Sequence, residues 1–335
     1  MMPEKHNAER RERYTKAVEQ LGNKEAPVRM DGVYTLIGLA DEWLLDENLD
    51  YAEKVREGQV IVNNLCACIR SSFALAFHYN ELTQESPTAK GLYKNREQEF
   101  YTDKAALESE VNIRLNIIKE IRSRLQGSKE NTPGVWSDFE YDFSRSIFFY
   151  PVDFTHSYYA KPVNFSGSAY QDEVRFDGSV YKDEADFGSS IYKSWATFDG
   201  STYTGWVGFN CSTYQSWADF SDSTCQSEVY FSDSTYKGKA DFCGSTYQNE
   251  VYFSYSTYQS EADFSDSIYQ GKADFSDSTY RGCADFRNST YQGRAGFTDS
   301  TYQSEVYFND STYQWAHFSG STYHKAVVLG DSVYG

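Results

Sequence analysis

The sequence has few of the residues on which most catalytic and metal sites depend. Its 335 residues include six cysteines and five histidines. The cysteines form no C-x-x-C pair and show no metal-ligand spacing, and the histidines fit no catalytic triad or ligand set. P-loop and G-x-G-x-x-G motifs are absent as well. We therefore predict that the protein is not an enzyme, that it has no cofactor or metal site, and that its cysteines are free thiols in a reducing compartment.

Positive charge and long apolar runs are also scarce. The chain has 31 Lys and Arg residues against 49 Asp and Glu residues, and residues 131–335 account for −15 of the net charge of −18. Because a nucleic-acid binder needs a basic face, we predict no direct nucleic-acid binding. The most apolar run, residues 60–77, contains Asn63 and Arg70, so we predict no membrane span. Residues 1–13 are polar and charged, unlike a signal peptide, which predicts a cytoplasmic protein.

One pattern dominates what is present, an aromatic repeat that extends from Val152 to Tyr334. Phe recurs every eleven residues from Phe154 to Phe308, and Tyr follows five residues after each Phe, with Cys225 as the single replacement. Ala or Val precedes each Phe by two residues, and Ser precedes each Tyr by two. This spacing does not fit the 3.6-residue period of a helix, but it places the small and aromatic residues on one side of short extended segments. The fixed period predicts a solenoid of short strands.

The repeat resembles that of a known family. Ala-Asp-Phe-Ser-Asp at residues 262–266 and again at 273–277 resembles the pentapeptide repeat, a small residue, Asp or Asn, Leu or Phe, and two polar residues. The resemblance covers more than half of the chain and implies a right-handed, four-sided parallel β-helix with 22 residues per turn. Tyr at every second centre and a six-residue second step depart from the family pattern. An inward Tyr hydroxyl needs a partner, which we expect to be the preceding Ser or the corner backbone.

The N-terminal third has helical periodicity. We predict helices at about residues 8–21, 27–45, 51–73 and 104–125, with a long loop or partly disordered insertion at 78–96. The runs Arg13–Gly22 and Val28–Leu36 are similar to a helical segment of actinobacterial pentapeptide repeat proteins and to a short HEAT-type pair.

The predicted fold class is therefore α+β, a HEAT-like helical domain followed by a β-helix. The predicted boundaries are a helical domain at 1–126, a linker at 127–134 and the repeat domain at 135–335, which consists of a cap at about 135–151, regular coils at 152–323 and a terminal coil at 324–335.

Two outward surfaces are candidate sites. A 22-residue turn stacks acidic residues about 4.8 Å apart, where each like-charged neighbour costs about 1 kcal/mol. Either these side chains bond the corner backbone, or the face mimics nucleic-acid phosphates, as the resemblance implies for family members that act on DNA gyrase. The second surface is aromatic and either binds a partner or packs over a corner. The acidic candidates are Asp219, Asp241, Asp263, Asp285, Asp222 and Asp266, and the aromatic candidates are Trp195, Trp206 and Trp217.

We therefore predict a non-catalytic protein–protein interaction scaffold built on an acidic β-helical rod. The alternative is a DNA mimic that binds and inhibits or protects a DNA-handling enzyme such as a topoisomerase. The sequence does not identify the protein partner, and it leaves a homodimer open.

Overall fold

The computed structural model describes residues 2–334, with side chains from Asn7 to Ser332. Its first part is helical. The helices are α1 (Met2–Leu21), α2 (Ala26–Leu44), α3 (Tyr51–Arg70), the 3₁₀ helix η1 (Ala74–His78), α4 (Tyr79–Leu82) and α5 (Glu97–Leu125). The four long helices lie where the sequence predicts them, and Asp50 caps α3 in a capping box with Glu53.

The predicted long loop, by contrast, is ordered. It contains α4, and Tyr93 within it is buried. The Glu81 carboxylate accepts the backbone N–H groups of Leu92 and Tyr93, which closes the loop on itself. Local polarity favours a loop at this position, but it does not reveal this internal bonding.

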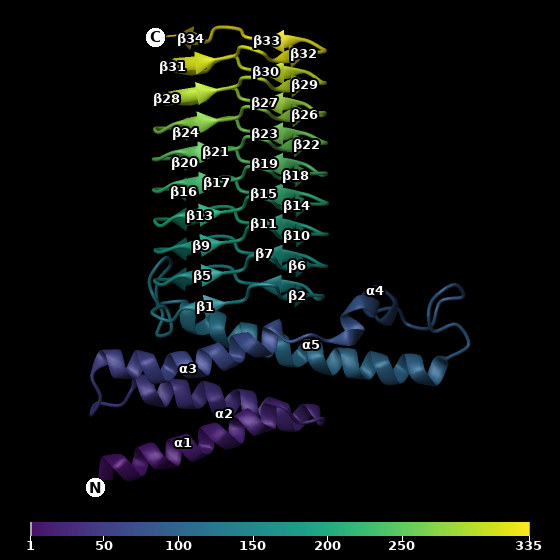
Figure 1. Cartoon of the computed structure of the whole chain (residues 1–335), viewed down its shortest axis with the longest axis vertical. Helices are drawn as coiled ribbons and strands as arrows, with labels where there is room; N and C mark the ends of the chain where they lie inside the picture. Colours follow the sequence, from purple (N-terminus) through teal and green to yellow (C-terminus); the bar gives the residue numbers. More distant parts are fainter. Residues whose placement is uncertain (1, 335) are drawn as a thin grey trace.

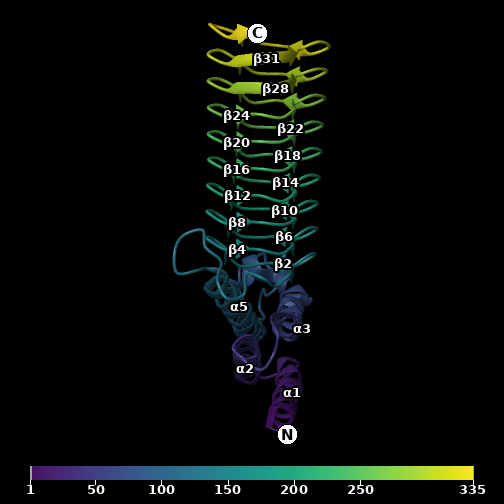
Figure 2. The ribbon, with the colours of Figure 1, turned by 90° about the vertical axis from the view of Figure 1, so that its left-hand side faces the viewer.

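The rest of the chain is a parallel β-solenoid of about nine coils, with four short strands in each coil (Figures 1 and 2). Each strand pairs with the strand 22 residues away, as the repeat predicts; Val163, for example, pairs with Ala185. The four strand columns define faces A to D, and β28 and β31 run around the corner from face D to face A.

Faces A and C carry the strands that precede Phe. Face A consists of β1 (Tyr141–Asp142), β5 (Val163–Asn164), β9 (Ala185–Asp186), β13 (Val207–Gly208), β17 (Val229–Tyr230), β21 (Val251–Tyr252), β25 (Ala273–Asp274) and the ends of β28 (Thr290–Gly296) and β31 (Thr312–His317). Face C consists of β3 (Val152–Asp153), β7 (Val174–Arg175), β11 (Ala196–Thr197), β15 (Ala218–Asp219), β19 (Ala240–Asp241), β23 (Ala262–Asp263), β27 (Ala284–Asp285), β30 (Val306–Tyr307) and β33 (Val327–Val328).

Faces B and D carry the strands that end mainly in Tyr. Face B consists of β2 (Ile147–Phe148), β6 (Ala169–Tyr170), β10 (Ile191–Tyr192), β14 (Thr213–Tyr214), β18 (Thr235–Tyr236), β22 (Thr257–Tyr258), β26 (Thr279–Tyr280), β29 (Thr301–Tyr302) and β32 (Thr322–Tyr323). Face D consists of β4 (Tyr158–Tyr159), β8 (Val180–Tyr181), β12 (Thr202–Tyr203), β16 (Thr224–Cys225), β20 (Thr246–Tyr247), β24 (Ile268–Tyr269), the starts of β28 and β31, and β34 (Val333–Tyr334).

The core of the rod is two columns of stacked Phe rings. Phe165 stacks on Phe187 with ring centroids 5.2 Å apart and an interplanar angle of 6°. Phe176 from the opposite face meets Phe165 edge to face at 5.0 Å. Such pairs add about 0.5–1.5 kcal/mol each beyond area burial. The predicted stacking of alternate Phe residues on opposite faces is confirmed.

Each Ser that precedes a Tyr mainly serves the backbone. The Ser212 N–H donates to Ser234 Oγ of the next coil at 3.1 Å, and the Ser234 hydroxyl donates to the Ser232 carbonyl at 3.1 Å. The Tyr192 hydroxyl reaches the Phe187 carbonyl at 3.5 Å. The Ser ladder therefore holds the coils together, and the partner expected for Tyr from the backbone is a long contact here.

The corner after each Phe requires a left-handed residue two positions on. Asp, Asn and Gly tolerate this region best, and they occupy most of these corners. The rest include Arg145, His156 and Tyr255, whose φ angles are 57°, 54° and 58°.

The helices cover the N-terminal end of the rod (Figure 1). Trp136 is fully buried and donates from Nε1 to Asp41 of α2 at 2.8 Å. Phe139 packs against Gly58 of α3, where an added Cβ would lie 2.5 Å from the Phe139 ring. Arg122 of α5 bonds Asp153 at 2.5 Å. Residues 135–151 thus join the rod to the helices that cover it, and regular strand pairing already begins within them, at Tyr141.

The predicted linker at 127–134 is also ordered, since Gln126 and Pro133 form an antiparallel bridge. At the other end of the rod, β33 in the predicted terminal coil pairs with β30.

Candidate functional site

The predicted acidic row lies on face C in the expected register. Asp219, Asp241, Asp263 and Asp285 occupy successive strands, each paired with the next. Each carboxylate accepts the backbone N–H two residues further on; for Asp263 this is the Ser265 N–H at 3.0 Å. Asp219, Asp241 and Asp285 are largely buried. The geometry therefore agrees with the interpretation in which these residues bond the corner backbone.

Cations of the chain neutralise much of face C. Lys239 pairs with Asp241 at 2.8 Å, and Arg287 Nε bonds Asp285 at 2.9 Å. Burial raises the pKa of Asp241, but Lys239 and Cys243 together bring it below its ordinary value. For Asp263, burial is the largest effect and raises the pKa, and Asp241 and Asp285 raise it further. Charge along the row is thus uneven rather than phosphate-like.

The other two acidic candidates lie at corners beside this face. Asp222 and Asp266 are exposed and have φ angles of 53° and 56°. Their position is the left-handed corner that follows Phe, which favours Asp for conformational reasons alone.

The three Trp candidates do not form one surface. Trp195 and Trp217 meet edge to face at 5.9 Å beside face C. Trp206 is eleven residues from each, half a turn, and therefore lies beside face A. Trp195 is 52% exposed. The predicted aromatic interface is thus a pair on one side and a single ring on the other.

Face C also contains a group of potential metal ligands. The ligand atoms of Asp241, Cys243 and Asp263 lie within 4.8 Å of one another. Burial and the neighbouring carboxylates raise the pKa of the Cys243 thiol, so this sulfur stays protonated. Since Lys239 already pairs with Asp241 and a thiol is a weak ligand, the group does not favour a metal.

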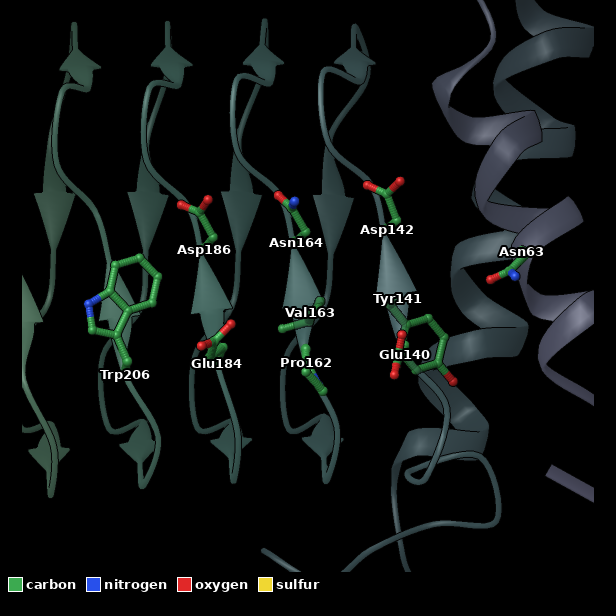
Figure 3. Close-up of a pocket in the computed structure, with 10 residues that line it drawn as sticks. All are labelled: Asn63, Glu140, Tyr141, Asp142, Pro162, Val163, Asn164, Glu184, Asp186 and Trp206. Carbon is green, nitrogen blue, oxygen red and sulfur yellow. The ribbon is translucent and has the colours of Figure 1, made fainter. Parts of the chain in front are cut away.

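The sequence does not predict a pocket of about 290 Å³ between α3 and the first four strands of face A (Figure 3). Eight of its residues form two columns on the outer surface of the coils. Asp142, Asn164, Asp186 and Gly208 pair in register along one column. Two residues before each of these stand Glu140, Pro162, Glu184 and Trp206, and Asn63 of α3 lies on the other side.

The pocket is acidic, and little of that charge is neutralised. Its lining contains Glu140, Asp142, Glu184 and Asp186 and no Lys or Arg. Asp142 pairs with Arg70 of α3. Across the described part of the chain, no ion pair involves the other three carboxylates. This distinguishes the pocket from face C, where bound cations are frequent.

Gly208 allows Trp206 to lie over the strand surface. A Cβ on Gly208 would approach the Trp206 ring to 2.7 Å, closer than side chains tolerate. The half-buried Trp206 ring also contacts Tyr230 of the next coil, with centroids 5.9 Å apart. Glycine at this strand position therefore determines where the indole closes the pocket.

A second depression continues from this pocket along α3. It is lined by Tyr51, Val55 and Val60 of α3 and shares Asn63 and Glu140 with the pocket. Tyr51 and Val60 are 61% and 45% exposed. We call the two together the junction groove, defined by the residues named in this and the preceding three paragraphs.

The signals that could have revealed this site are departures from the repeat. Pro162, Trp206 and Gly208 replace residues that are charged or hydroxyl-bearing in many other coils. The contribution of α3 to the groove carries no local signal, because it depends on how the helix packs beside β1.

Comparison of the chain with protein-family models, curated proteins and solved structures finds no match. Among residues 2–334 no single helix has the length and apolar composition of a membrane span, although α3 together with the bent segment 74–82 reaches both thresholds.

Proposed function

We propose that this chain is a non-catalytic scaffold that binds another protein through the junction groove. The observation that carries the proposal is the groove itself, where exposed apolar side chains of α3 continue into a pocket of carboxylates without ion-pair partners. Interfaces combine apolar anchors with oriented polar groups in this way.

The groove is held in place before any partner arrives. The Gln59 side chain donates to the Glu140 carbonyl at 2.8 Å and accepts the Glu140 N–H at 2.9 Å. Arg70 donates to the Asp142 carbonyl at 2.9 Å. Because both walls are fixed, binding loses less conformational entropy than binding to a mobile surface.

The rod is proposed to belong to the pentapeptide repeat family. The Ala-Asp-Phe-Ser-Asp units and the four strands in each coil support this assignment. DNA mimicry by face C receives less support, because a mimic needs a row of accessible charges and Lys239 and Arg287 neutralise part of this row. We therefore place the binding surface in the groove.

Two matched Asn→Lys variants test the proposal. Asn63→Lys places a cation against the groove carboxylates, whereas Asn112→Lys makes the same change on an exposed position of α5. Proteins from a cytoplasmic extract are captured on each variant and on the parent, at low salt and at about 0.5 M salt, where exposed charges are screened.

A partner retained by the parent and by Asn112→Lys, but lost from Asn63→Lys, is the expected result. Equal retention by all three proteins would place binding elsewhere, and capture of no protein by the parent would remove the basis of the proposal. A basic DNA-handling protein held only at low salt, and equally by both variants, would point to face C.

A further inference from the structure

We propose that the pocket of the junction groove binds an arginine side chain of the partner protein, next to an apolar residue that packs on α3. This inference rests on the proposed function and adds the chemistry of the partner.

The charge of the pocket favours a cation. Glu140, Glu184 and Asp186 lack ion pairs among the described residues, so their mutual repulsion is relieved only by a cation from outside. Asp186 uses one oxygen to accept the Gly188 N–H at 2.9 Å, which fixes its direction and leaves the second oxygen for a ligand.

The spacing of the acceptors favours a group with several divergent donors. Strands in adjacent coils lie about 4.8 Å apart, so Asp142 and Asp186 stand about 10 Å apart with Asn164 between them. The Glu140 and Glu184 pair flanks Pro162 in the same way (Figure 3). A guanidinium has five donors in a planar fork and can bond acceptors on both sides, whereas a lysine ammonium is a compact point charge.

The aromatic wall points to the same group. Trp206 lies over Gly208 at the end of the pocket, where its ring can contact a planar cation. Stacking on an indole is a property of arginine and contributes about 0.5–2 kcal/mol.

The size and continuation of the site indicate a side chain from a protein. A volume of about 290 Å³ lies at the lower limit of pockets for free ligands, and the pocket opens into the apolar depression at Val55 and Val60. A segment that places arginine in the pocket brings its neighbouring residue over this depression. An arginine beside a leucine therefore matches both parts of the groove.

The probe is a fluorescein-labelled peptide, acetyl-Gly-Leu-Arg-Leu-Gly-amide, with citrulline and lysine versions as competitors. Citrulline keeps the planar shape of arginine and removes the charge. Binding is measured by fluorescence anisotropy on the full chain. We expect the arginine peptide to bind at least about tenfold more tightly than the citrulline peptide, with lysine between them.

Two variants with matched controls locate the binding. Glu184→Gln with Asp186→Asn keeps the fold, because Asn164 already occupies the equivalent position one coil earlier, and it should reduce arginine-peptide affinity about tenfold or more. The control, Asp222→Asn with Asp266→Asn, removes the same charge from exposed corners and should change affinity less than about twofold.

Gly208→Ala displaces the Trp206 ring and should weaken binding severalfold. Its control, Gly296→Ala, lies in the same column beyond the pocket, where the nearest contact of an added Cβ would be 3.1 Å. Far-UV circular dichroism confirms that each variant is folded.

Equal binding of the arginine and citrulline peptides, or no binding of either, would refute the arginine assignment. So would equal losses in the pocket variants and their controls. These outcomes are separate from the scaffold proposal: a partner lost from Asn63→Lys but unaffected by Glu184→Gln with Asp186→Asn would preserve the scaffold and exclude the arginine pocket.

Discussion

Truncation of a central Phe ring tests how the coils are held together. Phe231 lies on face A after β17, in the fifth of nine coils, and is 2% exposed. Its ring stacks on Phe209 at 5.0 Å and on Phe253 at 4.9 Å. Two more Phe rings of the opposite column, Phe220 and Phe242, meet it edge to face at 5.0 Å and 4.9 Å.

The expected destabilisation is large but local. Phe→Ala in a core costs about 3–5 kcal/mol, and the loss of four aromatic pairs places Phe231→Ala at the upper end of this range. Because each coil contacts only its neighbours, the substitution weakens the interface between two halves of the rod. We expect urea unfolding to separate into two transitions, one for each side of the fifth coil.

The assay combines urea denaturation, followed by far-UV circular dichroism, with hydrogen exchange resolved by peptide. Phe231→Leu should cost less than about 1.5 kcal/mol, and exposed Asp233→Asn on the same coil less than about 0.5 kcal/mol. A loss below about 1.5 kcal/mol for Phe231→Ala, or protection lost equally in every coil, would refute the reasoning from stacked rings and nearest neighbours.

Three further substitutions have defined outcomes in the same denaturation assay. Cys225→Phe fills the single gap in the face D aromatic column and should stabilise the rod by about 1 kcal/mol, more than Cys225→Tyr, whose buried hydroxyl needs a partner; destabilisation by both would mean that the coil has already closed the gap. Ser234→Ala removes the acceptor of the Ser212 N–H and should cost about 1–3 kcal/mol, and no loss would show that the Ser ladder is dispensable. Burial and the carboxylates of Asp177 and Asp219 raise the pKa of Asp199 to about 6 from an ordinary value of 3.8, so the folded state holds this proton more tightly than the unfolded state, and the resulting stability, full below about pH 4, is lost as pH rises through 6. Asp199→Asn should therefore flatten stability between pH 4 and 6 and raise it at pH 7, whereas an unchanged pH profile would contradict the assigned pKa.

The architecture of the rod could be predicted because its determinants are local and repeated. The alternation of Ala or Val with Phe, and of Ser with Tyr, specifies two inward residues per strand, and the eleven-residue period specifies which strands pair. The corner geometry followed from the same pattern, since Asp222 and Asp266 sit where a left-handed residue is required. The four long helices were equally readable from their apolar periodicity.

The sites were less predictable because each repeat presents nearly the same local sequence. Whether an outward Asp is paired depends on residues beside it in space. Asp241 has Lys239 close by, whereas Asp186 has no cation within reach among the described residues. Grouping Trp206 with Trp195 was wrong because an eleven-residue separation is half a turn and places the two rings on opposite faces.

The sequence by itself thus determined the coil, its register and its aromatic core, because these depend on spacing along the chain. Only the tertiary structure placed α3 beside β1 and so created the junction groove, because that contact joins Gly58 and Gln59 to Phe139 and Glu140 across about 80 residues. Gly208 illustrates both levels. Its identity is plain in the sequence, but its consequence, the position of the Trp206 ring, depends on side-chain packing that only the folded chain defines.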